Sequence, residues 1–229
     1  MRVMPVRDPQ ISSAVEDYAK AIYALEALGP GTVTTTAIAE RMGVTAASAS
    51  GMVRKLCELD LVSHEPYKGV QLSPKGARVA LEVIRHHRLL ELYLAQDLGV
   101  PWDRVHAEAE VLEHVLSEEL EDLIAAKLCD PTVDPHGDPI PTRDLVIEER
   151  PSVSLSDLEP GAHATFVRIS DTDPEMLRWL AERGIAPGAC LEVVDKQPFG
   201  GPLFASFESG DVQVIGGRLA EAMRVEVPA

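Results

Sequence analysis

Two short helical segments, joined by the tetrapeptide MGVT, constrain the fold of this chain more than any other feature of its sequence. The spacing predicts a helix over residues 34–42, ended by Gly43, and a second helix over residues 46–59 with Thr45 as its N-cap. Two short helices joined in this way are typical of a helix-turn-helix. The segment LVSHEPYKGVQLSPKG follows at once and predicts a strand, a turn at residues 66–69 and a second strand. Together these elements predict a winged helix.

The rest of the chain divides into a helical part and a strand-rich part. Apolar residues at helical spacing predict helices over residues 12–28, 74–98 and 101–128. Residues 129–151 are rich in proline, aspartate and glycine and are expected to form a linker. Beyond them, short strand-like runs are interrupted by a single predicted helix, residues 175–183, which favours a small β-barrel of the SH3 type. We therefore expect an α+β fold with more than one domain.

Charge and cysteine usage exclude several classes of protein. The chain carries 37 acidic and 21 basic side chains, and its net charge of −16 argues against a general polyanion binder or a membrane-surface protein. Residues 1–75 are neutral overall, whereas residues 76–150 carry a net −10 and residues 151–229 a net −6. The three cysteines are isolated, which fits a reducing cytosol and excludes a thiolate zinc knuckle. Because no signal peptide or long apolar run is present, we expect a soluble, cytoplasmic protein without a membrane span.

The second helix of the helix-turn-helix, AASASGMVRKLCEL, has the features of a DNA-recognition helix. Small residues in its first turns allow close approach to a groove, and the basic pair that follows can reach phosphates. The candidate DNA-binding residues are Thr45, Ala47, Ser48, Ser50, Gly51, Arg54 and Lys55 at this helix, and Tyr67 and Lys68 in the wing turn. A winged helix used for protein contact is the alternative, and the lack of a strong basic patch counts in its favour.

The helical segment after Pro101 carries an edge of candidate metal ligands. On a helix, four of its residues fall within an arc of about 100°. These residues are His106, Glu110, Glu113 and His114. The neighbouring face is expected to form the core side, and it consists of Leu112, Leu116, Leu120 and Leu123.

The preceding helix carries His87 and Glu91 four residues apart, on one face. One such pair alone is more often part of a solvated polar face. Two helices that each present histidine and glutamate favour a divalent cation, which would relieve the repulsion among the carboxylates. A zinc hydrolase is the rival interpretation, but the chain lacks the H-E-x-x-H pair of such enzymes. His64, His136 and His163 have no such neighbours and are expected at the surface.

Several long stretches, in the same order, resemble the DtxR/MntR family of metal-dependent transcriptional repressors over nearly the whole chain. They are EDYAKAIY, AERMGVTAASASGMVRKL, LSPKG, RHHRLLE, VHAEAEVLEH and DPHGDPIP. The resemblance implies a winged-helix DNA-binding domain over residues 1–75 and a helical metal-binding and dimerisation domain, with its linker, over residues 76–150. It also implies an SH3-like, FeoA-like domain over residues 151–229. That order agrees with the pattern of helices and strands above.

The resemblance further implies two metal sites in each chain. The family's principal site falls on Asp17, Glu110, Glu113 and His114. The ancillary site falls on His87, Glu91 and His106, with Asp173 as a ligand from the C-terminal domain and Asp171 as the alternative to it.

The identity of the metal follows from two of these positions. Iron-sensing members of the family have methionine and cysteine where this chain has Asp17 and Glu110, whereas manganese-sensing members resemble this sequence. A site with only oxygen and imidazole donors suits Mn²⁺, which agrees with the resemblance on independent grounds. Short manganese sensors have a further glutamate three residues after the aspartate. Here that position is Lys20, so the paired-metal geometry of those proteins is not expected.

The sequence thus predicts a Mn²⁺-activated, homodimeric repressor of manganese uptake or efflux genes, and not an enzyme. Its partner is expected to be double-stranded, palindromic operator DNA, with half-sites about one helical turn or a multiple apart. Metal held between the first helix and the dimerisation domain would fix the spacing of the two recognition helices, and repulsion among the carboxylates would loosen that connection in its absence. An iron-responsive repressor, activated by Fe²⁺, is the nearer alternative, and a metallohydrolase is the farther one.

Overall fold

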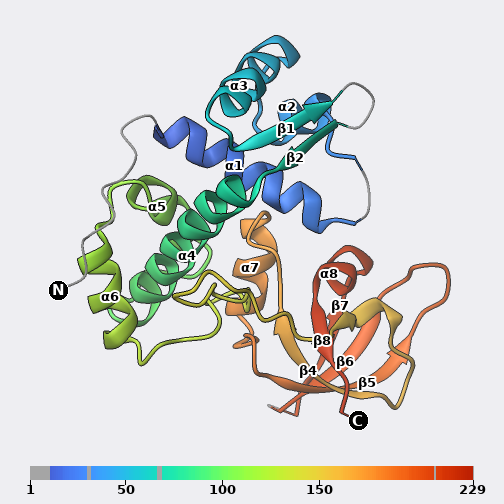
Figure 1. Ribbon diagram of the computed structural model, residues 1–229. Helices are drawn as coiled ribbons and strands as arrows, with labels where there is room; N and C mark the ends of the chain where they lie inside the picture. Colours follow the sequence, from blue (N-terminus) through green and yellow to red (C-terminus); the bar gives the residue numbers. More distant parts are fainter. Residues whose placement is uncertain (1–10, 30–31, 66–68, 209, 229) are drawn as a thin grey trace. The chain divides into compact units, whose positions relative to one another are not determined.

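The computed structural model describes residues 11–29, 32–65, 69–208 and 210–228 (Figure 1). The chain forms two compact units, and each is described by itself. The first unit comprises residues 1–87, 111–123 and 141–146, and the second unit comprises residues 88–110, 124–140 and 147–229. Among the helices of the described residues, none combines the length and the apolar character needed to cross a membrane.

The N-terminal part of the first unit is a helix-turn-helix preceded by one longer helix. Its helices are α1 (Ser13–Ala27), α2 (Thr35–Arg41) and α3 (Ala46–Glu58). The side chains of Thr34 and Thr45 cap α2 and α3 by accepting the backbone N–H groups of Ala37 and Ser48. Apolar residues from all three helices form one buried cluster, which includes Ile22, Ile38 and Leu56. The predicted helix-turn-helix is confirmed.

Two short antiparallel strands complete the winged helix. They are β1 (Val62–Glu65) and β2 (Gly69–Leu72), with Val62 opposite Leu72. Gly69 has a φ of +71°, and a Cβ atom there would lie 2.5 Å from the carbonyl oxygen of Val33, so the position requires glycine. The close approach lets Val33 form a bridge with Val70 beside the hairpin. Tyr67 and Lys68 lie outside the described residues.

The predicted helix over residues 101–128 is wrong, because it is two helices. The long helix α4 (Pro74–Gln96) is followed by α5 (Val105–Leu112) and α6 (Glu118–Lys127). Ser117 begins α6: its carbonyl accepts the N–H of Glu121 and its hydroxyl accepts the N–H of Leu120. Three acidic residues in the first turn of α6 complement the helix dipole. Glu113 and His114 therefore lie in the turn between two helices.

The leucine face that was expected to form the core is mostly exposed in the single chain. Only Leu116 is buried; Leu112, Leu120 and Leu123 are 38%, 48% and 62% exposed. Two valines beside them are also exposed. We call this set the apolar face, and it consists of Val111, Leu112, Val115, Leu120 and Leu123. All five belong to the first unit.

Part of the segment predicted as a linker, residues 129–151, forms a defined turn after α6. Val133 forms a bridge with Pro139, and the Asp134 carboxylate accepts the N–H groups of His136 and Asp138. This turn buries His136 completely, so the expectation of a surface histidine is wrong. His64 and His163 are exposed as expected.

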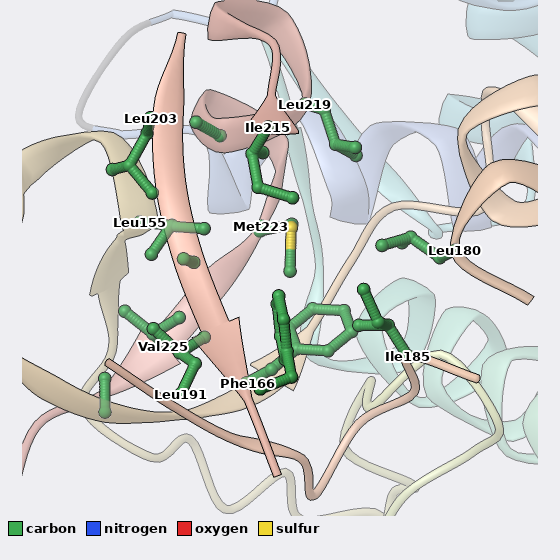
Figure 2. Close-up of a cluster of buried hydrophobic side chains, with 14 of the residues drawn as sticks. Leu155, Phe166, Leu180, Ile185, Leu191, Leu203, Ile215, Leu219, Met223 and Val225 are labelled. Atoms are coloured by element: carbon green, nitrogen blue, oxygen red, sulfur yellow. The ribbon is translucent and has the colours of Figure 1, made fainter. Parts of the chain in front are cut away.

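The C-terminal part of the second unit is an SH3-like sheet with a well-packed core. Its strands are β3 (Val153–Ser154), β4 (His163–Arg168), β5 (Cys190–Lys196), β6 (Leu203–Phe207), β7 (Val212–Ile215) and β8 (Arg224–Glu226). They pair in the order β3-β8-β4-β5-β6-β7, so the sheet is open and not the closed barrel that was expected. Figure 2 shows side chains such as Phe166, Leu191 and Val225 gathered in its buried cluster.

In the described part of residues 151–229, three short helices accompany this sheet, where the sequence predicted one. They are η1 (Leu155–Asp157), α7 (Pro174–Ala181) and α8 (Gly217–Ala222). The predicted helix corresponds to α7, whereas η1 and α8 were missed because each is too short to show a periodic apolar pattern. Leu180 of α7 and Leu219 near α8's centre both join the core in Figure 2.

Candidate metal centres

The first unit brings together Asp17, Glu113 and His114, three of the four residues expected at the principal site. Each can offer one ligand atom, and these atoms all lie within 4.8 Å of one another. Nε2 of His114 is 2.9 Å from Oδ1 of Asp17 and 3.5 Å from Oε1 of Glu113. Asp17 comes from α1, whereas Glu113 and His114 come from the turn after α5. The cluster thus joins α1, which packs against the helix-turn-helix, to the turn after α5.

A carboxylate that sequence reasoning missed orients His114. Oε2 of Glu16 lies 2.6 Å from Nδ1 of His114, and Glu16 is buried. When Nδ1 carries the proton and donates it to Glu16, Nε2 presents its lone pair to the side where Asp17 and Glu113 converge. Histidine ligands of metals are commonly held in this way, by a carboxylate on the other ring nitrogen. Glu16 is next to Asp17 in the sequence, but nothing in a single sequence separates its role from that of a surface residue.

Glu113 is the most buried member of the cluster, with no exposed side-chain surface. Burial alone would raise the pKa of its carboxyl group, but the hydrogen bond from Nδ1 of His87 and the positive charge of Lys20 outweigh burial and lower that pKa. Nζ of Lys20 lies 2.8 Å and 3.0 Å from the two carboxylate oxygens. Glu113 is therefore held as a carboxylate, the protonation state that binds metals.

A buried polar network fixes the turn that carries Glu113. His86 donates from Nδ1 to the backbone carbonyl of Glu113, 3.1 Å away, and its Nε2 lies 3.0 Å from Oε2 of Glu121. Burial lowers the pKa of His86, but the hydrogen bond and charge of Glu121 outweigh that effect and raise it. Arg85 also binds Glu121 and donates to the carbonyl of Pro141 at 2.6 Å. His86, placed between the Glu113 carbonyl and the Glu121 carboxylate, keeps the backbone at Glu113 in place.

The second unit contains a second cluster, made of Glu91, His106 and Asp171. Nδ1 of His106 lies 2.7 Å from Oδ2 of Asp171 and 3.4 Å from Oε1 of Glu91. The hydrogen bonds to Asp171 and then to Glu91 raise the pKa of His106 to about 10. Metal binding at this cluster therefore has to displace a proton from His106, so metal affinity there increases with pH.

Asp171 takes the position that was expected for Asp173. The side chain of Asp173 is the N-cap of α7, where it accepts the backbone N–H groups of Glu175 and Met176. The carboxylate of Asp173 is therefore used to cap α7. The sequence could have shown the difference, because Asp173 directly precedes Pro174, and aspartate followed by proline is a typical helix start.

His87 and Glu110 remain to be placed. His87 belongs to the first unit, where it binds Glu113, and it lies one helical turn before Glu91 on α4. Glu110 belongs to the second unit, on α5, with its Oε1 3.8 Å from Nε2 of His106. Their participation in the principal or ancillary site stays a prediction.

In the second unit, His136 lies between Trp102 and Glu91 and contacts both. Its ring stacks on Trp102 with the ring centroids 5.7 Å apart, and its Nε2 is 2.8 Å from the carbonyl oxygen of Trp102. Nδ1 faces Oε2 of Glu91 at 3.6 Å and is the buried side-chain atom, among the described residues, that has no hydrogen-bond partner. Burial, which lowers the pKa of His136, is outweighed by Glu91, and the pKa rises to about 9.

Both clusters fit a divalent cation of intermediate hardness. Their donors are carboxylate oxygens and imidazole nitrogens, and among the described residues no cysteine belongs to either cluster. Such donor sets suit Mn²⁺, Fe²⁺ and Zn²⁺, whereas thiolates would be needed to favour the softest ions. The cluster of Asp17 also links two elements that are distant in the sequence, α1 and the turn after α5.

The candidate DNA-binding residues of the described chain lie on the exposed side of α3. They are Thr45, Ala47, Ser48, Ser50, Gly51, Arg54 and Lys55, and all seven are exposed. The opposite side, with Ala49, Val53 and Leu56, is buried in the core. A Cβ atom at Gly51 would meet nothing within 4 Å, so packing inside the chain does not require glycine there. The exposed side of α3 thus presents small residues in its first turns, followed by the basic pair Arg54 and Lys55.

Comparisons with known proteins agree with this arrangement. Residues 10–70 match the family model for the N-terminal DNA-binding domain of iron-dependent repressors, residues 73–142 match the model for their metal-binding and dimerisation domain, and residues 153–227 match the FeoA domain. The chain is 32% identical to the iron-dependent repressor IdeR of Mycobacterium tuberculosis over 204 residues, which cover 84% of this chain and 88% of the relative. It is 30% identical to the diphtheria toxin repressor of Corynebacterium diphtheriae, over 92% of this chain and 96% of the relative.

A solved structure of a manganese-dependent transcriptional repressor, in complex with manganese, resembles the chain more strongly. The TM-score is 0.87 at 41% sequence identity, over 93% of this chain and all of that one. The order of domains, the metal-binding donor sets and these similarities together establish the class. The chain belongs to the DtxR/MntR family of metal-dependent transcriptional repressors, and it is a DNA-binding regulator and not an enzyme.

Proposed function

We propose that this chain is a Mn²⁺-activated repressor that binds palindromic operator DNA as a homodimer and controls genes of manganese homeostasis in the cytoplasm. The observation that carries the proposal is the convergence of Asp17, Glu113 and His114, whose donor atoms are oxygen and nitrogen only. We infer that Glu110 is the fourth ligand. The similarity to a repressor solved with manganese supports the choice of metal. A repressor activated by Fe²⁺ is the alternative, supported by the relatives that are iron-dependent.

The mechanism follows from the two parts of the chain that supply the proposed ligands: α1 supplies Asp17, and the turn after α5 supplies Glu113 and His114. A divalent cation at this site would neutralise the carboxylates and connect α1 to the turn between α5 and α6. Because α1 packs in the same core as α2 and α3, fixing α1 also fixes the recognition helix. His86 and Glu121 hold the other side of the connection by keeping the backbone of Glu113 in place. Metal thus shifts a population of arrangements towards the one that fits DNA.

We infer that the apolar face contacts a second copy of the chain. Its five residues are aliphatic, neighbouring in sequence and exposed, and two of them, Val111 and Val115, are more than 70% exposed. An aliphatic surface of this kind is typical of a permanent protein interface. The family model that matches residues 73–142 describes a dimerisation domain. With two recognition helices related by symmetry, the natural target is a palindrome with half-sites about one helical turn or a multiple apart.

Operator binding by the purified protein tests the proposal. We expect Mn²⁺ to be required, and we expect the affinity to decrease steeply with salt concentration because contacts to phosphates release counterions. The measurement is a titration of labelled promoter DNA with protein, with Mn²⁺ or with a chelator, at several salt concentrations. The variant Arg54→Ala should reduce the slope of log affinity against log salt by about 1. Equal affinity with metal and with chelator would refute the repressor mechanism.

The second cluster should bind a metal ion of its own. We propose Glu91, His106 and Asp171 as its ligands, with His87 from the preceding turn of α4. Crystals soaked in Mn²⁺ should show anomalous scattering at this cluster as well as at the Asp17 cluster. The variant His106→Ala should remove the second peak alone, while His163→Ala, an exposed histidine, should change neither. A single peak at the Asp17 cluster at saturating Mn²⁺ would remove this claim.

A further inference from the structure

Lys20 lies at the candidate principal site, but it is not one of the ligands. It follows Asp17 by three residues on α1, so both side chains leave the helix on one side. Its ammonium group is within hydrogen-bond distance of both carboxylate oxygens of Glu113, at 2.8 Å and 3.0 Å. The two residues are separated by 93 positions in the sequence, so the tertiary fold alone brings them together.

This ion pair differs from an ordinary surface salt bridge. The Glu113 side chain is 0% exposed and that of Lys20 is 22% exposed. In the pair between Lys127 and Asp97, by comparison, the side chains are 61% and 26% exposed. Exposed pairs contribute little, whereas a fully buried carboxylate requires compensation of its charge. Lys20 supplies a permanent positive charge where a metal ion would supply one.

One of the two carboxylate oxygens that Lys20 contacts also faces His114. Oε1 of Glu113 is 2.8 Å from Nζ of Lys20 and 3.5 Å from Nε2 of His114. A cation bound between His114 and Glu113 has to share this oxygen with the ammonium group or displace it. Two positive charges at such a distance repel each other. The flexible, partly exposed stem of Lys20 allows its head group to move into solvent.

We propose that Lys20 is an internal competitor of the metal ion for Glu113, and that it sets the concentration of free metal at which the principal site fills. The inference rests on the proposed function, because it concerns the same site. In the metal-free chain the ammonium group compensates Glu113 and favours the empty site. Metal binding includes the release of Lys20 from Glu113. The site therefore fills at a higher concentration of free metal than it would without the ammonium group.

The test is the affinity for Mn²⁺ alone, measured by isothermal titration calorimetry without DNA. All variants carry His106→Ala, which removes the second cluster and leaves the Asp17 cluster to be measured. We expect Lys20→Gln to lower the Kd for Mn²⁺ by about tenfold or more, which corresponds to about 1.4 kcal/mol. Lys20→Arg keeps the charge and should stay within a few-fold of the parent. Lys127→Gln removes a lysine from an ion pair far from the cluster in sequence and should not change the Kd.

Thermal unfolding separates competition from a purely structural role. Without metal, Lys20→Gln should melt below the parent, because Glu113 loses a counter-charge; with saturating Mn²⁺ the deficit should shrink or vanish. A variant that melts lower in both conditions and binds Mn²⁺ no more tightly would overturn the proposal and leave the repressor function standing. A parent protein that binds no divalent ion at all would refute both.

Discussion

Operator binding in the presence of Mn²⁺ should decrease by about 10³-fold or more when Glu113 is replaced by glutamine, which is the smallest difference commonly found between specific and non-specific DNA binding. Glutamine keeps the size of the side chain but removes the charge that binds a cation. Two contacts depend on that charge, because His87 and Lys20 both meet the same carboxylate, and the proposed metal ion would depend on it too. The measurement is the affinity for labelled promoter DNA at saturating Mn²⁺.

The matched control for this change is Glu108→Gln. Glu108 lies on α5, is exposed and belongs to neither cluster, so the substitution removes one negative charge from the same helix without touching a candidate ligand. It should bind the operator like the wild type. Circular dichroism should confirm that Glu113→Gln is folded. If folded Glu113→Gln keeps its Mn²⁺-dependent affinity, Glu113 is not a ligand and the proposed principal site is wrong.

The second large effect concerns which metal activates the protein. The double change Asp17→Met with Glu110→Cys should shift activation from Mn²⁺ towards Fe²⁺ or Co²⁺, because a thioether and a soft thiolate replace two hard carboxylates. Divalent affinity rises from Mn²⁺ towards Fe²⁺ and beyond at most mixed sites, so a site can favour Mn²⁺ only by ligand type and geometry. The fold should survive, because Asp17 is partly exposed on α1 and Glu110 is half-buried on α5. Operator affinity at equal free metal, under anaerobic conditions, is the measurement.

A second double variant makes this result specific. Asp17→Asn with Glu110→Gln removes the same two charges but adds no sulfur, so it should weaken activation by every metal without changing their order. If the methionine–cysteine variant also keeps the wild-type order of metals, selectivity lies elsewhere, and the proposal of Mn²⁺ loses its chemical basis.

Local sequence signals predicted the DNA-reading part of the fold well. Thr34 and Thr45 cap the two helices of the helix-turn-helix, and capping is a short-range effect that a sequence displays directly. The break between α5 and α6 had an equally local signal, because Ser117 precedes a first turn with three acidic residues. Helical periodicity obscured it, since the apolar spacing continues across the break. The prediction that Glu113 and His114 share a helix face with His106 failed for that reason.

The partners of the candidate ligands could not be predicted. Glu16 and His114 are separated by 98 positions in the sequence, and Lys20 and Glu113 by 93. A periodic pattern within one helix cannot predict contacts between residues so far apart. His136 is a similar case. Its surroundings are rich in proline and aspartate and indicate a linker, yet the turn made by Asp134 carries it into the core. Composition describes what a segment contains, and only the fold decides which of its side chains are enclosed.

The apolar face also has a genetic consequence. It lies on α5, α6 and the turn between them, whereas the candidate DNA-binding residues lie on α3, so damage to one leaves the other intact. A chain altered at Arg54 and Lys55 would keep its apolar face and pair with unaltered copies. In the proposed mechanism both half-sites of a palindrome are filled at once, so each mixed pair would be unable to repress. Alleles that damage α3 should therefore be dominant over the wild type, and alleles that place charges on the apolar face should be recessive.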